Sequence, residues 1–180
     1  MSLSAEARAA NVSLVILDVD GVLTDGRLLF GPQGEALKVF NVRDGHGVKL
    51  LREAGLEVAI LSSRCSDIVA VRARELGVNH VLQGETDKRA GFVRLLADTE
   101  LNAPQCAFIG DDWPDLPVLS QVGFAATVAD AAPEVRNIAH WIATANGGCG
   151  AVRQLAEFIL RAQGKFDAAL LRHSGENVHA

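Results

Sequence analysis

The amino-acid sequence predicts an α/β protein in which helices cover both faces of a mainly parallel β-sheet. Three observations support this prediction. Short apolar runs alternate along the chain with longer segments of helical spacing, as in consecutive β-α-β units. The first run, Leu14–Leu17, is apolar at every position, which is typical of a strand buried on both faces. A chain of 180 residues with 49% hydrophobic residues can form one full core, so we expect a single domain over residues 1–180.

The short apolar runs predict strands at Leu14–Leu17, Val58–Leu61, His80–Leu82, Ala107–Ile109, Phe124–Thr127 and Trp141–Ala143. The longer segments predict helices at Gly47–Ala54, Asp67–Leu76, Lys88–Asp98, Leu116–Gln121, Pro133–Asn137 and Ala151–Gln163. Ser66 is suited to cap the start of the second helix, and Gly77 is suited to end it. Gly55 and Gly164 are suited to end the first and last helices, and residues from about 165 to 180 are expected to form a C-terminal tail.

One segment interrupts the alternation directly after the first strand. Residues Arg27–Phe30 and Glu35–Phe40 flank the turn sequence Gly31-Pro32-Gln33-Gly34, which predicts a β-hairpin over about residues 27–41. No interval along the chain is long enough for a separate cap domain. A two-stranded hairpin is marginally stable alone, so its apolar side chains need a surface to pack on. We expect a neighbouring subunit to provide that surface.

Composition excludes several classes of protein. The formal net charge is −5 and the isoelectric point is about 5.5, which argues against a nucleic-acid partner. Cys65, Cys106 and Cys149 are widely spaced and are expected to be free thiols of a reducing cytoplasm. Residues Met1–Asn11 lack the apolar segment of a signal peptide, and no stretch is suited to cross a bilayer. The sequence therefore predicts a cytoplasmic protein without a membrane partner.

Polar residues follow several of the expected strands. Two like-charged carboxylates, Asp18 and Asp20, come directly after the first strand, and such a pair needs a cation or a proton-transfer role. The ends of parallel strands converge on one crevice, so residues far apart in the sequence are expected to meet there. The others at or near such positions are Ser62, Ser63, Arg64, Lys88, Asp111, Asp112 and Asp115. A phosphoryl-transfer site supplies both the cation and the proton-transfer role.

This set of residues resembles the motifs of the haloacid dehalogenase-like (HAD) phosphatase superfamily. The matching motifs are DxDx[TV] at Asp18–Val22, a strand-ending Ser62, Lys88, and GDDxxD ending at Asp115. Longer matches resemble one branch, the 3-deoxy-D-manno-octulosonate 8-phosphate (Kdo 8-phosphate) phosphatases. They are DVDGVLTDG at the first motif, FNVRDGHG at Phe40–Gly47, GDDWPDLPV at Gly110–Val118, GG-x-GAVR at Gly147–Arg153 and AQGK at Ala162–Lys165.

The resemblance implies a Rossmann-like, HAD-like, capless fold and hydrolysis of a sugar-acid phosphate monoester. Asp18 is then the nucleophile that forms an aspartyl-phosphate, and Asp20 is the general acid and base. Mg²⁺ is the expected cofactor, held by Asp18, Asp111 and the backbone carbonyl of Asp20. The implied product is Kdo, made in the cytoplasm for lipopolysaccharide, by a homotetramer assembled around the hairpins.

The remaining site residues are expected to bind the substrate or support the site. Ser62 and Lys88 would contact the phosphoryl oxygens, and Ser63 and Arg64 would contact the rest of the substrate. Asp115 would orient Lys88, and Asp112 would lie beside the metal ligands.

Two departures from the branch pattern leave other substrates and functions open. The branch often has Thr-Gly-Arg where this chain has Ser62-Ser63-Arg64, and it often has arginine where this chain has Cys149. A nine-carbon, sialic-type 9-phosphate is therefore the alternative substrate. A non-catalytic phosphate-binding module is the alternative of another class, because fold alone does not determine function. A dehalogenase is disfavoured by Asp20, and a phosphomutase by the missing cap.

Overall fold

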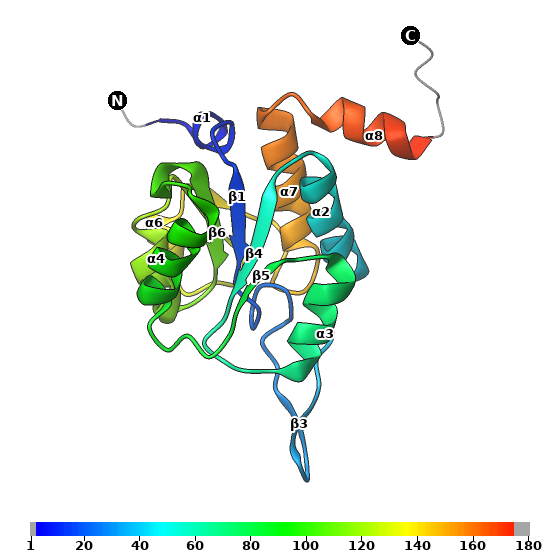
Figure 1. Cartoon of the computed structure of the whole chain (residues 1–180), viewed down its shortest axis with the longest axis vertical. Helices are drawn as coiled ribbons and strands as arrows, with labels where there is room; N and C mark the ends of the chain where they lie inside the picture. Colours follow the sequence, from blue (N-terminus) through cyan, green and yellow to red (C-terminus); the bar gives the residue numbers. More distant parts are fainter. Residues whose placement is uncertain (1–2, 175–180) are drawn as a thin grey trace.

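The structure, a computed structural model, describes residues 3–174. Its centre is a six-stranded parallel sheet in the order β5-β4-β1-β6-β7-β8, which confirms the predicted fold class (Figure 1). The strands are β1 (Leu14–Leu17), β4 (Glu57–Leu61), β5 (His80–Leu82), β6 (Cys106–Gly110), β7 (Phe124–Thr127) and β8 (Trp141–Ile142). Strand β1 lies between β4 and β6 and is buried along its whole length, so its carboxyl end opens at the middle of the sheet.

Helices cover both faces of the sheet. Figure 1 shows α4 and α6 on one side and α2, α3 and α7 on the other. The helices are α1 (Ala5–Ala9), α2 (Val42–Glu53), α3 (Asp67–Leu76), α4 (Lys88–Thr99), α5 (Leu116–Leu119), α6 (Pro133–Ile138), α7 (Ala151–Ala162) and α8 (Phe166–Ser174), with 3-10 turns η1 (Ala103–Gln105) and η2 (Trp113–Asp115). Among residues 3–174, none of these helices has the length and apolar character needed to cross a membrane.

Three elements differ from the sequence prediction. Helix α2 begins at Val42 instead of Gly47, because the Asn41 side chain accepts a hydrogen bond from the Arg43 N–H at 2.8 Å and caps an earlier turn. Helix α1 was not expected. Part of the expected C-terminal tail is helix α8, and residues 175–180 lie outside the described part of the chain.

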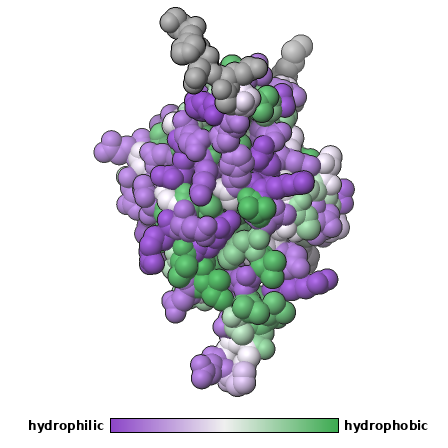
Figure 2. Space-filling view, turned by 90° about the vertical axis from the view of Figure 1, so that its right-hand side faces the viewer, coloured by the Kyte–Doolittle hydropathy of each residue, from purple (hydrophilic) through white to green (hydrophobic). Residues whose placement is uncertain are grey.

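The predicted hairpin is present and projects from the end of the sheet where the strands finish (Figure 1). Its strands β2 (Leu29–Gly31) and β3 (Gly34–Leu37) pair antiparallel. Several of its apolar side chains are exposed in the single chain, with Phe30 64% and Val39 67% accessible. Figure 2 shows hydrophobic residues gathered over this part of the molecule. The hairpin therefore offers an apolar surface that the rest of the described chain does not cover.

Helix α8 is fastened to α2 and α7 by a chain of two histidines. The Arg153 guanidinium can only donate, so His46 Nδ1, 3.0 Å away, accepts. His46 Nε2 then carries the proton and donates to His173 Nε2 at 3.1 Å, and His173 Nδ1 donates to the Ala169 carbonyl at 3.0 Å. The arrangement requires His46 to be neutral, because its Nδ1 accepts a hydrogen bond. Burial, and then the charge of Arg153, lower the pKa of His46 from its ordinary value.

We predict that helix α8 loosens in acid. A histidine whose pKa is lowered by folding stabilises the fold above its unfolded pKa of about 6.5, and that contribution is lost as the pH falls through the folded value. Losing one hydrogen bond of about 1 kcal/mol should lower amide-exchange protection across residues 166–174 about fivefold between pH 8 and pH 5. Hydrogen exchange with mass spectrometry measures this. In His173→Ala protein the pH dependence should disappear, and a pH-independent wild type would contradict the prediction.

Candidate active site

All nine site residues expected from the sequence line one pocket at the carboxyl ends of the central strands. The pocket has a volume of about 340 Å³. The expected residues that line it are Asp18, Asp20, Ser62, Ser63, Arg64, Lys88, Asp111, Asp112 and Asp115. They come from the loops after β1, β4 and β6 and from the start of α4. The convergence of parallel strand ends thus brings together residues almost a hundred positions apart in sequence.

Lys88 lies between two buried carboxylates at the centre of this pocket. It is the first residue of α4, which is capped by Asp87, and only 4% of it is exposed. Its ammonium is 2.7 Å from Asp18 Oδ1 and 2.5 Å from Asp115 Oδ1. Burial alone would lower the pKa of Lys88, but the charges of Asp18 and Asp115 outweigh it and raise the pKa. Lys88 is therefore held as an ammonium ion against Asp18.

Asp115 joins Lys88 to the loop that carries Asp111. Its second carboxylate oxygen accepts hydrogen bonds from the backbone N–H groups of Asp111 at 2.9 Å and of Asp112 at 3.2 Å. The predicted contact between Asp115 and Lys88 is thus present, and Asp115 also shapes the loop after β6. Asp112 is exposed, and its expected place beside a metal stays a prediction.

The loop after β1 fits closely around Asp111. Gly21 has φ +93° and its Cα faces the Asp111 carboxylate, so any side chain at position 21 would collide with that carboxylate. Gly147 packs against the Gly21 carbonyl in the same way, and the N–H of Gly148 donates to the Val22 carbonyl at 2.9 Å. Glycine is therefore required at positions 21 and 147 for the loops to approach this closely.

Asp44 fixes the segment that carries Gly147 and Gly148 to the start of α2. This role was not predicted from the sequence. Asp44 is buried at the start of α2, and its carboxylate accepts from the N–H of Gly150 at 3.0 Å and of Arg153 at 2.8 Å. These are free N–H groups at the start of α7. The motifs at Phe40–Gly47 and Gly147–Arg153 thus meet each other and support the loop after β1.

Asp18, Asp111 and Asp115 could hold a metal ion. Each offers a carboxylate oxygen, and the three oxygens lie within 4.8 Å of one another. Burial, and then the charge of Asp115, raise the pKa of Asp18 to about 6, while burial, and then the charge of Asp18, raise the pKa of Asp111 to about 8. The cluster therefore lacks positive charge, and its oxygen-only ligands suit Mg²⁺. Both oxygens of Asp115 are already engaged, one by Lys88 and the other by the N–H groups of Asp111 and Asp112, so Asp18 and Asp111 are the carboxylates we expect to bind a metal. The backbone ligand expected at Asp20 stays a prediction.

The serines after β4 face the same pocket. The N–H of Ser62 donates to the Leu82 carbonyl at 2.9 Å, which continues the pairing of β4 with β5. Its buried hydroxyl oxygen accepts from the N–H of Arg64 at 3.3 Å, so the hydroxyl proton can be given to an anion. The hydroxyl of Ser63 is also buried, with no hydrogen-bond partner among residues 3–174.

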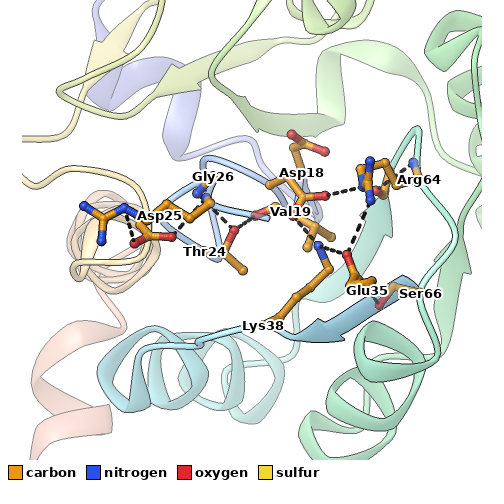
Figure 3. A network of polar contacts seen from close by, with 12 residues as sticks. Asp18, Val19, Thr24, Asp25, Gly26, Glu35, Lys38, Arg64 and Ser66 are labelled. Atoms are coloured by element: carbon orange, nitrogen blue, oxygen red, sulfur yellow. Dashed lines mark hydrogen bonds and ion pairs between the residues drawn. The ribbon is translucent and has the colours of Figure 1, made fainter. Parts of the chain in front are cut away.

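The sequence analysis missed two polar residues of the hairpin. Lys38 forms ion pairs with Asp20 and with Glu35, and the latter distance is 3.0 Å (Figure 3). Glu35 also lies 3.5 Å from Arg64, and Arg64 lies 3.7 Å from the other oxygen of Asp20. The three-residue spacing of Glu35 and Lys38 was the available signal, but the apolar residues around them suggested a purely hydrophobic surface.

Comparisons with known proteins show what the chain is similar to. Residues 38–155 match the family model of haloacid dehalogenase-like hydrolases. The chain is 46% identical over 162 residues to the 3-deoxy-D-manno-octulosonate 8-phosphate phosphatase KdsC of Yersinia pestis, covering 90% of this chain and 87% of the relative. A probable yrbi family phosphatase from Pseudomonas syringae has a TM-score of 0.93 at 45% identity, over 96% of this chain and 98% of that one.

A third relative was solved with ligands. The 3-deoxy-D-manno-octulosonate 8-phosphate phosphatase of Moraxella catarrhalis, in complex with magnesium, phosphate and KDO, has a TM-score of 0.91 at 38% identity. The match covers 94% of this chain and 97% of that one.

We predict that Mg²⁺ stabilises the protein, and more strongly at high pH. Carboxyl groups whose pKa is raised by folding stabilise the metal-free fold at low pH, and this is lost as the pH rises through about 6 for Asp18 and about 8 for Asp111. Mg²⁺ at a hundred times its Kd would add about 2.7 kcal/mol, or roughly 5–10 °C in Tm.

Thermal denaturation with and without Mg²⁺ at pH 6 and pH 8.5 measures this effect. Asp111→Asn should abolish most of the Mg²⁺ shift, whereas the exposed Asp98→Asn on α4 should keep it. An equal Mg²⁺ shift at both pH values, or a full shift in Asp111→Asn protein, would show that the metal binds elsewhere.

Proposed function

The chain belongs to the haloacid dehalogenase-like hydrolases, and on that basis we propose that it is a Mg²⁺-dependent phosphatase that hydrolyses Kdo 8-phosphate to Kdo and phosphate. The observation that carries the proposal is the buried contact of Lys88 with Asp18 beside Asp111, in a chain so similar to Kdo 8-phosphate phosphatases. The complex of the Moraxella relative with magnesium, phosphate and KDO supports both the cofactor and the product.

The proposed reaction has two steps at Asp18. A carboxylate oxygen of Asp18 attacks phosphorus, the bond from phosphorus to the sugar oxygen breaks, and Asp20 gives its proton to that oxygen. Water then attacks the aspartyl-phosphate, Asp20 takes a proton from the water, and Asp18 is released with inorganic phosphate. Lys88, 2.7 Å from Asp18, offsets negative charge in both transition states. Bound at Asp18 and Asp111, Mg²⁺ would neutralise charge between nucleophile and phosphoryl group.

The sugar part of the substrate is proposed to bind on the side of the pocket where Arg64 lies. Ser62 and Lys88 can bind phosphoryl oxygens, and both are buried beside Asp18. The side chain of Arg64 is 41% exposed at the pocket wall, so it can reach an anionic group of a bound sugar acid. The exposed Cys149 stands where the branch often has arginine, which keeps a nine-carbon sugar-acid phosphate as the alternative substrate. A non-catalytic module would not be expected to retain Asp18, Asp20, Lys88 and Asp111 together.

The proposed working form is a cytoplasmic homotetramer assembled through the hairpin, acting on the route to lipopolysaccharide. The apolar hairpin surface described above supports self-association, because exposed side chains of this size gain about 25 cal/mol for each Å² that they bury. A neighbouring subunit would also cover a pocket that has no cap domain.

We predict that Asp18→Asn reduces turnover at least a thousandfold, because the amide is a poor nucleophile. Phosphate release is measured from Kdo 8-phosphate, a sialic-type 9-phosphate and a neutral hexose phosphate, with and without Mg²⁺. The exposed Asp25→Asn is the matched control and should keep wild-type turnover. Retention of a tenth of the wild-type rate by Asp18→Asn would reject the nucleophile. If the hexose phosphate is hydrolysed as well as Kdo 8-phosphate, the substrate is wrong although the phosphatase assignment stands.

Replacing Leu29 and Phe30 together by serine should release subunits, because these substitutions remove apolar surface from the hairpin. Light scattering at micromolar concentration measures the mass of wild type and variant. Val93→Ser, which changes an equally exposed side chain on α4, should leave the mass of the assembly unchanged. A monomeric wild type would end the proposal of a tetramer.

A further inference from the structure

We propose that Lys38 is a positioning residue, which holds the Asp20 side chain in the orientation needed for proton transfer to the leaving group. This inference rests on the proposed function, because it assigns a role relative to the acid of that reaction. Lys38 follows the second strand of the hairpin, and its ammonium contacts Asp20 in the loop after β1.

The first observation is the burial of Lys38. Its side chain is only 1% exposed, although the neighbouring Leu37 and Val39 on the same hairpin are open to solvent. A buried ammonium is costly unless it is paired, and its partners here are Asp20 and Glu35. Lys38 is thus placed by its charge partners, and not by general packing of the hairpin.

The second observation is that both oxygens of Asp20 face cations. Lys38 contacts Oδ1, and the Nε atom of Arg64 is 3.7 Å from Oδ2. The Asp20 carboxylate is partly accessible, at 19% of its side chain, and lies at the pocket surface. The Lys38 contact is the shorter of the two, so Lys38 is the main restraint on the orientation of Asp20.

The third observation is that residues outside the hairpin fix the position of Lys38. Ser66, at the start of α3, donates its hydroxyl proton to Glu35 Oε2 at 2.5 Å, and Glu35 Oε1 lies 3.0 Å from the Lys38 ammonium. Ser66 was expected to cap α3, but its side chain makes no capping bond and serves Glu35 instead. Figure 3 shows Ser66, Glu35 and Lys38 side by side. A continuous chain of contacts therefore runs from α3 through Glu35 and Lys38 to Asp20.

This chain has a chemical consequence at the leaving group. Proton delivery to an alkoxide depends on where the acid points, and general acid catalysis contributes about 10²–10⁴-fold. A p-nitrophenolate leaving group needs little protonation, so a badly oriented Asp20 should matter less for it. Removing Lys38 should therefore act on the reaction selectively, through Asp20.

The test compares kcat/KM for a sugar phosphate and for p-nitrophenyl phosphate, because kcat/KM reports the steps through leaving-group departure. The variants are Lys38→Met, Asp20→Asn, the double variant, and Lys49→Met as the matched control on an exposed lysine of α2. Lys38→Met should lower kcat/KM at least tenfold for the sugar phosphate and less than threefold for the aryl phosphate. In the Asp20→Asn background it should change the sugar-phosphate value less than twofold, and Lys49→Met should change neither substrate.

Each contrary outcome overturns the proposal. Equal losses on both substrates, a further tenfold loss in the Asp20→Asn background, or no loss at all would each show that Lys38 does not act through Asp20. The ratio of the two substrates is measured on one preparation, so partial unfolding cancels from it. Should Lys38→Met be insoluble, Glu35→Gln weakens the same chain and should show a smaller loss of the same selectivity. If wild type ignores Kdo 8-phosphate, the proposed substrate fails, and the Lys38 test is run with whichever alkyl phosphate is hydrolysed.

Discussion

The site depends on one interaction, the buried ammonium of Lys88 between the carboxylates of Asp18 and Asp115. The contacts of 2.7 Å and 2.5 Å join the start of α4 to the ends of β1 and β6, and Asp115 passes the connection on to the backbone of Asp111. Removing one partner of such a buried set typically costs about 3–5 kcal/mol, because the remaining charge is left uncompensated. The same contact therefore orders three loops and presents the Asp18 carboxylate to the pocket.

One ammonium does not balance the negative charge around it. Asp18, Asp111 and Asp115 bring three carboxylates against Lys88, and burial withholds the water that would screen them. Burial, and then the neighbouring carboxylates, raise the pKa of Asp18 to about 6 and that of Asp111 to about 8. A cation bound beside these carboxylates offsets the excess negative charge and stabilises the folded protein. The affinity for a metal therefore follows from the way the loops pack the carboxylates together.

Much of this could be predicted from the sequence, because it follows from local pattern. Short apolar runs mark the strands, so β1, β5 and β7 were predicted to the residue, and the parallel sheet then required the polar residues after its strands to meet. Long-range contacts of single side chains follow from no local pattern. Lys38 reaches Asp20 across 18 positions, and Asp44 reaches the start of α7 across more than a hundred. The first turn of α2 was missed because Gly45 and Gly47 weaken the helical pattern that Asn41 restores by capping.

The residues in and around the pocket thus belong to two parts of the fold, and the sequence can vary more freely in one than in the other. Asp18, Lys88 and Asp115 lie on or beside the ends of the buried sheet, where packing allows little variation. Lys38 and Glu35 belong to the hairpin, which contacts the body through these polar groups and through Phe40 at its end. Arg64 lies between the two parts. A hairpin can vary in sequence without disturbing the sheet, because its side chains do not form the core. The proposed division follows from this: the sheet carries the phosphoryl chemistry, while the hairpin aligns the acid with the leaving group and so with the sugar that bears it.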